Sequence, residues 1–207
     1  MIIQSVEPHL LSCPLPEPVC YDFYGGRRTV FKRDAMVVSV RGENGLVGHG
    51  PAAASEETAK LIVRDIAPML VGNEFSDPAG FVSLAISKLG SKALAAAGAV
   101  EVALYDLWGK LEGCSVTEFF GGRKQVTVCC YGSAGMYQSA ESYAHEAGAV
   151  CELGFSAYKY RPALGPAEDL RTVELMRQAV GPEVGLCLDA HGWWRMGDKS
   201  YDASTIE

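Results

Sequence analysis

The segment AYKYRPALGPAEDLRTVELMRQAVGPEVGLCLDAH, residues 157–191, decides the fold. It contains β-type runs at 157–161 and 184–189 and a helical run between them at 166–180. A proline suits the first turn of that helix, and a Gly-Pro pair ends it. Strands that alternate with helices of this length predict parallel βαβ units. The apolar spacing within the helix predicts one buried stripe, made by Leu170, Val173, Met176 and Val180.

Charged side chains stand at the ends of the two predicted strands. Lys159 and Arg161 share one face of the first strand, and Asp189 and His191 share one face of the second. Because parallel strands end at the same edge of a sheet, where α/β folds bind ligands, we expect the two pairs to be neighbours. Such a group could bind an acidic substrate, hold a metal and move protons. The structural alternative is that the aspartate caps a helix or a turn and that the Lys-x-Arg pair is a solvated edge.

The first 50 residues have the pattern of strands. Alternation over 36–41 is followed by Asn44-Gly45, a signal for a tight hairpin turn, and by a returning run at 46–50. The stretch 20–28 is rich in aromatic residues and glycine and has no clear period. We therefore expect it to be a mobile surface loop.

Residues 55–111 change to a helical pattern. Ser55 is a candidate N-cap with acidic residues in the following turn. Asp106 and Lys110 form an i,i+4 pair, and Gly113 stands where a C-cap glycine is expected. The spacing predicts one apolar stripe on a long helix, made by Ala97, Val100, Leu104, Leu107 and Leu111.

A change of pattern after Gly121-Gly122 marks the candidate domain boundary. A short β-rich run occupies 126–131, and a helix is expected over 139–153. The buried side of that helix should carry Tyr143, Ala147 and Val150. We therefore predict two domains, 1–122 and 123–207.

Composition narrows the class of protein. The chain has 207 residues, of which 48% are hydrophobic and 21% charged, as in ordinary soluble globular proteins. The 25 acidic residues outnumber the 18 basic ones, which gives a net charge of −7 and weighs against a nucleic-acid partner. A closed β/α barrel takes roughly 250 residues, so the chain cannot hold a whole barrel and another domain.

The sequence contains no clear targeting segment and no cysteine pattern typical of a metal site or a disulfide framework. The first residues lack the basic and apolar regions of a secretory signal, and no stretch is apolar enough for a membrane span, so we expect a cytoplasmic protein. The seven cysteines include no C-x-x-C pair. We expect neither a zinc site nor a disulfide framework, and most of the thiols should be buried and reduced.

Four segments together resemble the enolase superfamily, in particular its mandelate racemase and muconate lactonising branch. They are VRGENGLVGHG at 40–50, ALYDLWGK with FGG within 103–122, GFSAYKYR at 154–161 and LDAH at 188–191. One departure is Pro51, which stands where the family's hairpin usually continues with glutamate. The resemblance implies an α+β capping domain at 1–122 followed by the start of a β/α (TIM-type) barrel at 123–207, incomplete in this chain.

The family resemblance also implies a chemistry, the Mg²⁺-dependent abstraction of the proton α to a carboxylate through an enediolate. Asp189 would bind the metal, and Lys159 would lie against the substrate carboxylate. Arg161 matches the position where many members carry a basic lysine, but an arginine stays protonated and is better suited to clamp charge than to act as a base. His191 resembles the acid of the acid-sugar dehydratases. Tyr21 and Tyr24 match the family's mobile capping loop and would contact substrate.

Three functions remain open at this point. The first is dehydration of an aldonate or aldarate, with a small carboxylate substrate and a homo-oligomeric enzyme. The second is a racemase, epimerase or cycloisomerase on the same scaffold, and the third is a non-catalytic fragment or interaction module. The family's remaining metal ligands would follow residue 207, so we expect the 207-residue chain alone to be inactive.

Overall fold

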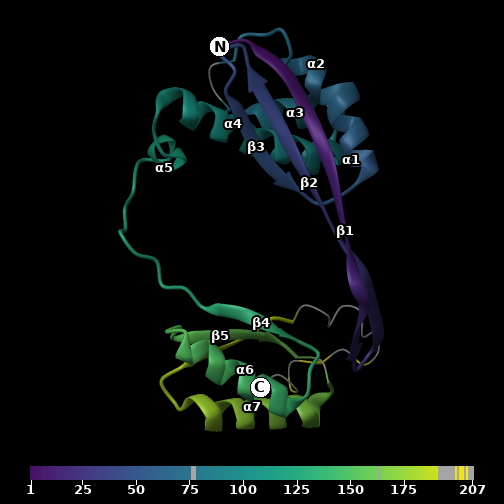
Figure 1. Cartoon of the computed structure of the whole chain (residues 1–207), viewed down its shortest axis with the longest axis vertical. Coiled ribbons are helices and arrows are strands. Elements are labelled where there is room, and N and C mark those ends of the chain that lie inside the picture. The colour runs from purple at the N-terminus through teal and green to yellow at the C-terminus, as the bar shows by residue number, and fades with distance from the viewer. Residues whose placement is uncertain (76–77, 163, 191–198, 200, 203, 205–207) are drawn as a thin grey trace. The chain divides into compact units, whose positions relative to one another are not determined.

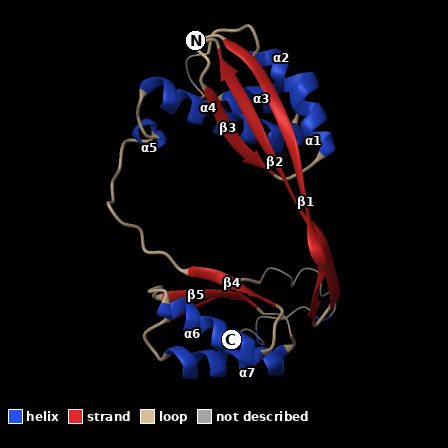
Figure 2. Ribbon diagram, in the orientation of Figure 1, coloured by secondary structure: helices blue, strands red, loops and turns tan. Residues whose placement is uncertain are grey.

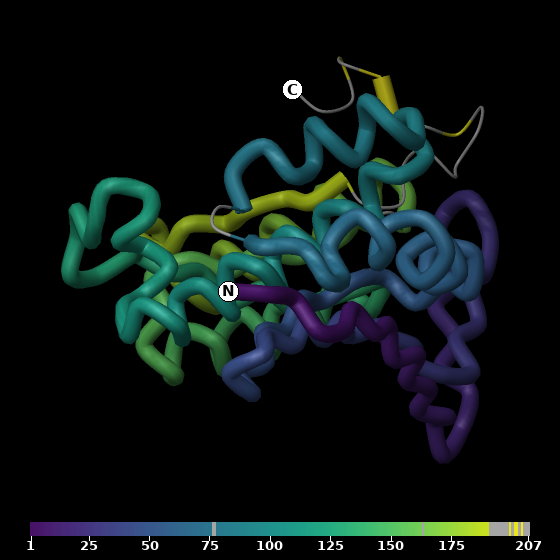
Figure 3. The backbone as a smooth tube through the Cα atoms, turned by 90° about the horizontal axis from the view of Figure 1, so that it is seen from above, coloured from purple at the N-terminus to yellow at the C-terminus, as the bar shows by residue number. Residues whose placement is uncertain are grey.

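The computed structural model describes residues 1–75, 78–162, 164–190, 199, 201, 202 and 204, which are drawn in colour in Figure 3. The chain forms two three-stranded sheets (Figure 2) and divides into two compact units. The first unit comprises Met1–Leu15 with Lys32–Val126, and the second comprises Pro16–Phe31 with Thr127–Glu207. Each unit has a hydrophobic core of its own.

The first sheet has the order β1-β2-β3, and the parts of β1 up to Leu15 and of β2 from Lys32 belong to the first unit. Its strands are β1 (Ile3–Phe23), β2 (Gly26–Gly42) and β3 (Val47–Ala52), labelled in Figure 1. β2 and β3 are antiparallel, with Arg41 opposite Val47. The Gly42 N–H donates to the Leu46 carbonyl at 3.0 Å across the turn. The Asn-Gly hairpin predicted from the sequence is therefore confirmed.

Seven helical segments follow in the first unit: α1 (Glu56–Leu61), η1 (Ile62–Ile66), α2 (Ala67–Leu70), α3 (Phe81–Leu89), η2 (Ser91–Ala93), α4 (Leu94–Glu112) and α5 (Val116–Phe119). The Ser55 hydroxyl caps α1 by accepting from the Thr58 N–H at 3.1 Å, as predicted. α4 ends at Gly113 in a left-handed conformation, also as predicted. Four of the five residues of the predicted stripe are buried, whereas Leu111 is 40% exposed.

Two glycines let β3 lie directly on α4. A Cβ built on Gly48 would stand 2.0 Å from the Ala103 carbonyl oxygen, and one on Gly50 would stand 2.0 Å from the Ala99 carbonyl oxygen. The His49 N–H between them donates to Asp106 of α4 at 2.8 Å. The Gly-x-Gly of the hairpin is thus a packing motif, since any side chain at either glycine would meet helix backbone.

The stretch 20–28 is the end of a hairpin, with two strand ends and a tight turn where the sequence predicted a surface loop. β1 continues to Phe23, a tight turn covers residues 24 and 25, and β2 begins at Gly26. Arg27 bridges the turn to Asp22, with 2.5 Å between Nε and Oδ1. Gly26 has a φ of +151°, a conformation that favours glycine. Gly25 and Gly26, which interrupt the strand pattern in the sequence, therefore form part of the tight turn and its exit.

The second unit contains a parallel βαβ arrangement. Its strands are β4 (Gly132–Met136), β5 (Ala157–Arg161) and β6 (Gly185–Leu188), in the order β4-β5-β6 and parallel throughout. α6 (Ala140–Glu152) and α7 (Pro166–Val180) pack together on one side of this sheet (Figure 1). The predicted helix at 166–180 and the predicted strand at 157–161 are confirmed. The predicted parallel pairing of this strand with the next one is confirmed as well.

Two details of the second unit differ from the sequence prediction. The β-rich run 126–131 is not a strand, because β4 begins only at Gly132, and Val126 is 82% exposed. In α7, Leu170 is 63% exposed and Val173 is also exposed. The buried positions are Asp169, Thr172 and Met176. The helix is rotated because the Asp169 carboxylate accepts from the Leu164 N–H at 3.1 Å and from the Tyr201 hydroxyl, which brings a polar residue inside.

The cysteines are not buried, so the prediction that most of them would be was wrong. Four are exposed and three are partly exposed. The exposed ones are Cys13, Cys20, Cys129 and Cys130. Cys129 and Cys130 lie in the irregular stretch before β4 and not on a strand, which explains why strand alternation did not bury either of them.

Candidate functional site

Strand β5 has one buried face and one partly exposed face, and the charged side chains lie on the exposed one. Tyr158 and Tyr160 are buried against the helices, whereas Lys159 and Arg161 alternate with them on the other face and are partly exposed. The alternation follows from the pleat of a strand, which sends successive side chains to opposite sides. The two tyrosines thus anchor the strand while the two cations are left available for a ligand.

The structure brings Lys159, Arg161 and Asp189 together. Lys159 Nζ lies 2.9 Å from Asp189 Oδ2, and Arg161 Nε lies 3.3 Å from the same oxygen. The β5–β6 register explains the meeting, since Tyr160 pairs with Leu188 and the Asp189 N–H donates to the Tyr160 carbonyl at 2.9 Å. The side chains are 20%, 20% and 29% exposed, respectively. The predicted neighbourhood of the strand ends is confirmed for these three residues.

The cluster of Lys159, Arg161 and Asp189 contains two cations and one carboxylate, which leaves one positive charge in excess. Arg161 Nη1 also donates to the Ala134 carbonyl at 3.4 Å, and Lys159 Nζ lies 5.9 Å from the ring centroid of Tyr131. Among the described residues the buried Arg161 Nε–H has no aligned hydrogen bond, so its approach to Asp189 is an electrostatic contact. A half-buried surplus of positive charge favours an anionic ligand at this edge.

Asp189 is suited in type to a hard cation such as Mg²⁺, which prefers carboxylate oxygens. Within the described ranges, however, no group of three or more His, Cys, Asp or Glu side chains could hold a metal ion. In the cluster with Lys159 and Arg161, the described carboxylate is that of Asp189, and His191 lies outside the described residues.

Tyr21 and Tyr24 contact the segments that follow β4 and β5. The Tyr21 ring lies edge-on to Tyr137, with 6.5 Å between centroids. The Tyr24 ring covers Gly165, where an added Cβ would stand 3.1 Å from Tyr24 Cδ2, and Lys199 Nζ lies 4.9 Å from the Tyr24 centroid. Both contacts lie within the second unit and join the hairpin end to the loops that follow the carboxyl ends of β4 and β5.

The contact of Tyr24 with Gly165 predicts how the hairpin end responds to protease. In Tyr24→Ala, trypsin should cut after Arg27 and Arg28 roughly three to ten times faster, because the ring that holds the turn is lost. Mass spectrometry of timed digests measures the cleavage. Tyr131→Ala removes a tyrosine of similar exposure, 50% against 41%, and should leave the rate unchanged. Equal rates in both variants and the wild type would mean that Tyr24 does not hold the hairpin end.

Three side chains of the second unit make polar contacts that the sequence did not predict: Tyr143 and Asp169, which are buried, and Glu146, which is partly buried. The Tyr143 hydroxyl donates to the Arg161 carbonyl at 2.5 Å. Glu146 accepts from the Tyr158 hydroxyl and, at 2.9 Å, from Gln138 Nε2. Tyr143 had been assigned to the buried face of its helix, but its hydroxyl needed a partner that the sequence pattern could not identify.

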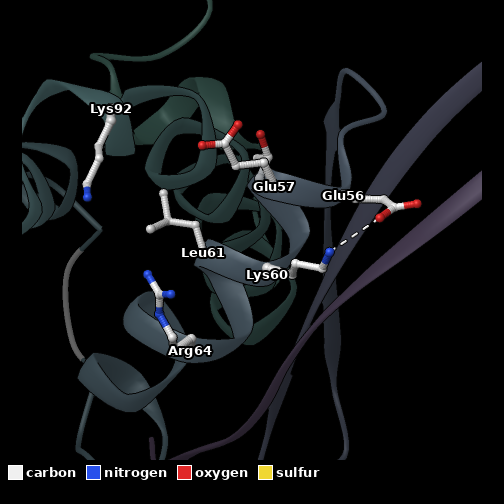
Figure 4. Close-up of a pocket in the computed structure, with 7 residues that line it drawn as sticks. Glu56, Glu57, Lys60, Leu61, Arg64 and Lys92 are labelled. Carbon is white, nitrogen blue, oxygen red and sulfur yellow. Dashed lines mark hydrogen bonds and ion pairs between the residues drawn. The ribbon is translucent and has the colours of Figure 1, made fainter.

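A hollow of about 710 Å³ is lined by residues of α1 and η1 in the first unit (Figure 4). Lys60 lies 3.3 Å from Glu56, and Arg64 lies 2.6 Å from its neighbour Asp65. Each of these cations thus has a carboxylate of its own, unlike the two that share Asp189. We therefore place the candidate site at the end of β5 and not in the hollow.

Both parts of the chain match families of known proteins. Residues 21–121 match the family described as "Mandelate racemase / muconate lactonizing enzyme, N-terminal domain", and residues 142–204 match "Enolase C-terminal domain-like". The described architecture fits such a capping domain followed by the start of the barrel domain. In the part of the chain that is described, no helix has the length and apolar character needed to cross a bilayer.

Individual relatives carry different activities. The chain is 26% identical to D-galactarolactone cycloisomerase of Agrobacterium fabrum, over 93% of this chain and 53% of that protein. It is 29% identical to L-rhamnonate dehydratase of Saccharopolyspora erythraea, over 95% and 51%. The substrate-liganded L-Ala-D/L-Glu epimerase from Bacillus subtilis has a TM-score of 0.76 at 26% identity, over 93% of this chain and 55% of that one. The chain thus spans about half the length of the relatives it matches.

Proposed function

This chain belongs to the mandelate racemase and muconate lactonizing enzyme branch of the enolase superfamily, and from that premise we propose that its protein abstracts the proton α to a substrate carboxylate. The observation that carries the proposal is the cluster in which Lys159 and Arg161 share Asp189 at the carboxyl edge of a parallel sheet. Ligands of α/β proteins bind at this edge.

Arg161 and Lys159 have the properties needed to bind a carboxylate. Both are partly exposed on the face of β5 away from the core, and both remain close to Asp189. A substrate carboxylate would complete the charge balance of the cluster. Because arginine stays protonated at any ordinary pH, Arg161 would bind and stabilise the negative charge that grows on the carboxylate as the α-proton leaves, and it would not take the proton.

Asp189 would be one oxygen ligand of Mg²⁺, and a bound Mg²⁺ would neutralise charge on the substrate carboxylate and make the α-proton more acidic. A single carboxylate falls short of the oxygen set that this ion requires. We infer that the further ligands come from outside the described residues.

Dehydration of an acid sugar is the specific reaction we propose. It is supported by His191, two residues after Asp189, which would protonate the leaving hydroxyl, and by the likeness to a rhamnonate dehydratase. Epimerisation or cycloisomerisation is the second candidate, supported by the likeness to an epimerase and a cycloisomerase.

Product analysis separates these reactions. The protein, in the form its source expresses, is incubated with MgCl₂ and a panel of aldonic acids, aldaric acids, aldarolactones and dipeptides. Dehydration predicts a 2-keto-3-deoxy acid, whereas an epimerase gives a new diastereomer and a cycloisomerase gives a ring-opened or ring-closed isomer without loss of water. Unchanged substrates throughout the panel would contradict the proposed function.

A further inference from the structure

We propose that Tyr143 of α6 is a positioning residue that fixes the end of β5 and thereby aims the Arg161 guanidinium at the ligand edge. The functional part of this inference rests on the proposed function, whereas the geometric part does not. The Tyr143 side chain is fully buried, and its hydroxyl donates to the Arg161 carbonyl at 2.5 Å.

The Arg161 carbonyl is held from two sides. The Tyr137 N–H, from the residue that follows β4, approaches the same oxygen at 3.4 Å. Tyr137 itself has a φ of +51°, uncommon for a residue with a side chain. A helix and a neighbouring strand end thus converge on one backbone oxygen, which leaves the last residue of β5 little freedom.

The Tyr143 ring is also packed in place, by contact with a second tyrosine ring. It lies edge-on to Tyr160, with 5.5 Å between centroids and 71° between planes. Burial raises the pKa of the Tyr143 hydroxyl, so the group remains a protonated donor. Loss of the hydroxyl leaves the Arg161 carbonyl with the longer bond from Tyr137 alone among the described residues.

The backbone position of Arg161 determines where its charge lies. Its Nε is 3.3 Å from Asp189 Oδ2 in an ion pair, and its Nη1 is 3.4 Å from the Ala134 carbonyl, near the limit for a hydrogen bond. A small shift of the strand end would break the hydrogen bond to Ala134 and lengthen the ion pair with Asp189. Tyr143 therefore acts on the ligand edge through Arg161 without touching the ligand itself.

Tyr158 provides a matched control within the same core. It is also fully buried, on β5 itself, and its ring stacks on Tyr160 at 6.1 Å. Its hydroxyl, however, donates to Glu146 of α6 and not to the strand end. Tyr143→Phe and Tyr158→Phe each delete one buried hydroxyl, and only the first deletes a bond to Arg161.

The test is hydrogen exchange of the Arg161 Nε proton, followed by ¹⁵N NMR on the protein without substrate. We expect exchange about tenfold faster in Tyr143→Phe and within twofold of the wild type in Tyr158→Phe. Where turnover is found, kcat/KM for the acid substrate should fall about tenfold in Tyr143→Phe and stay within twofold of the wild type in Tyr158→Phe, because only the first leaves Arg161 less well placed to bind the carboxylate and stabilise its growing charge. An unchanged exchange rate in Tyr143→Phe, or equal acceleration in both variants, would overturn the inference.

A second measurement needs no variant and covers the case in which Tyr143→Phe fails to fold. With ¹³Cζ-labelled tyrosine, the Tyr143 signal should show separate protonated and deuterated hydroxyl forms, because a buried donor exchanges slowly. The exposed Tyr131 should show one averaged signal. Averaging at Tyr143 would overturn the inference. Since both NMR readouts are made without substrate, a protein that turns over no substrate in the panel but passes them contradicts the proposed function and not the role of Tyr143.

Discussion

Asp189→Asn is expected to lower turnover of the acid substrate by at least about 100-fold to 1,000-fold, the range seen when one charge-stabilising group of an active site is removed. The substitution keeps the shape of the side chain but removes its negative charge. Lys159 and Arg161, which lie 2.9 Å and 3.3 Å from the same oxygen, would then face each other without a carboxylate between them. The change also removes the single carboxylate available to Mg²⁺ among the described residues of the cluster.

The matched control is Asp65→Asn in the first unit. Asp65 is also paired with an arginine, since Arg64 Nη2 lies 2.6 Å away, and its side chain is 24% exposed against 29% for Asp189. Because it lies on η1 and makes its ion pair with Arg64 and not with a residue of the cluster, turnover should stay within twofold of the wild type. The measurement is steady-state kcat/KM for both variants. Asp189→Asn with more than a tenth of wild-type activity would exclude Asp189 from the chemistry.

Gly50→Ala is expected to lower the free energy of unfolding by about 3 kcal/mol, the upper part of the usual range for overpacking. The new Cβ would stand 2.0 Å from the Ala99 carbonyl oxygen and 2.8 Å from the Ala103 backbone nitrogen. Helix backbone cannot turn aside as a flexible side chain can. β3 would have to move away from α4, along which it packs, and the Asp106 contact with the His49 N–H would be strained.

Gly98→Ala is the control for the change of glycine to alanine. Gly98 lies within α4, and a Cβ there meets nothing within 4 Å. Since alanine is the better helix former, Gly98→Ala should stabilise by up to about 1 kcal/mol. Urea unfolding of both variants gives the two free energies. If Gly50→Ala proved as stable as the wild type, β3 would not lie against α4 as described.

The sequence predicted secondary structure correctly where the hydrophobic pattern agrees with the packing in the structure. The bounds of the helix 166–180 and the strand 157–161 are those predicted, because Gly and Pro mark both ends and each element buries one face. The meeting of Lys159 and Arg161 with Asp189 followed from strand alternation and the parallel order alone.

Prediction failed where a polar partner outweighed hydrophobic spacing. α7 buries Asp169 in place of Leu170 because the carboxylate satisfies the Leu164 N–H and the Tyr201 hydroxyl. The apolar run 126–131 remains exposed in the described structure, since β4 starts six residues later than its first valine. The partner of the Tyr143 hydroxyl is a backbone carbonyl 18 residues away, and residue type gives no signal for such a contact.

Exchange of the substrate α-proton with solvent tests the central claim most directly, because dehydration and epimerisation both begin with its removal. The protein, in the form its source expresses, is incubated in D₂O with Mg²⁺ and each acid of the panel, and ¹H NMR follows the α-proton signal. We predict that the signal of at least one acid decays with the wild type and persists with Asp189→Asn. No decay for any acid, or equal decay with Asp189→Asn, would contradict the proposal that the cluster of Lys159, Arg161 and Asp189 belongs to a site of α-proton abstraction.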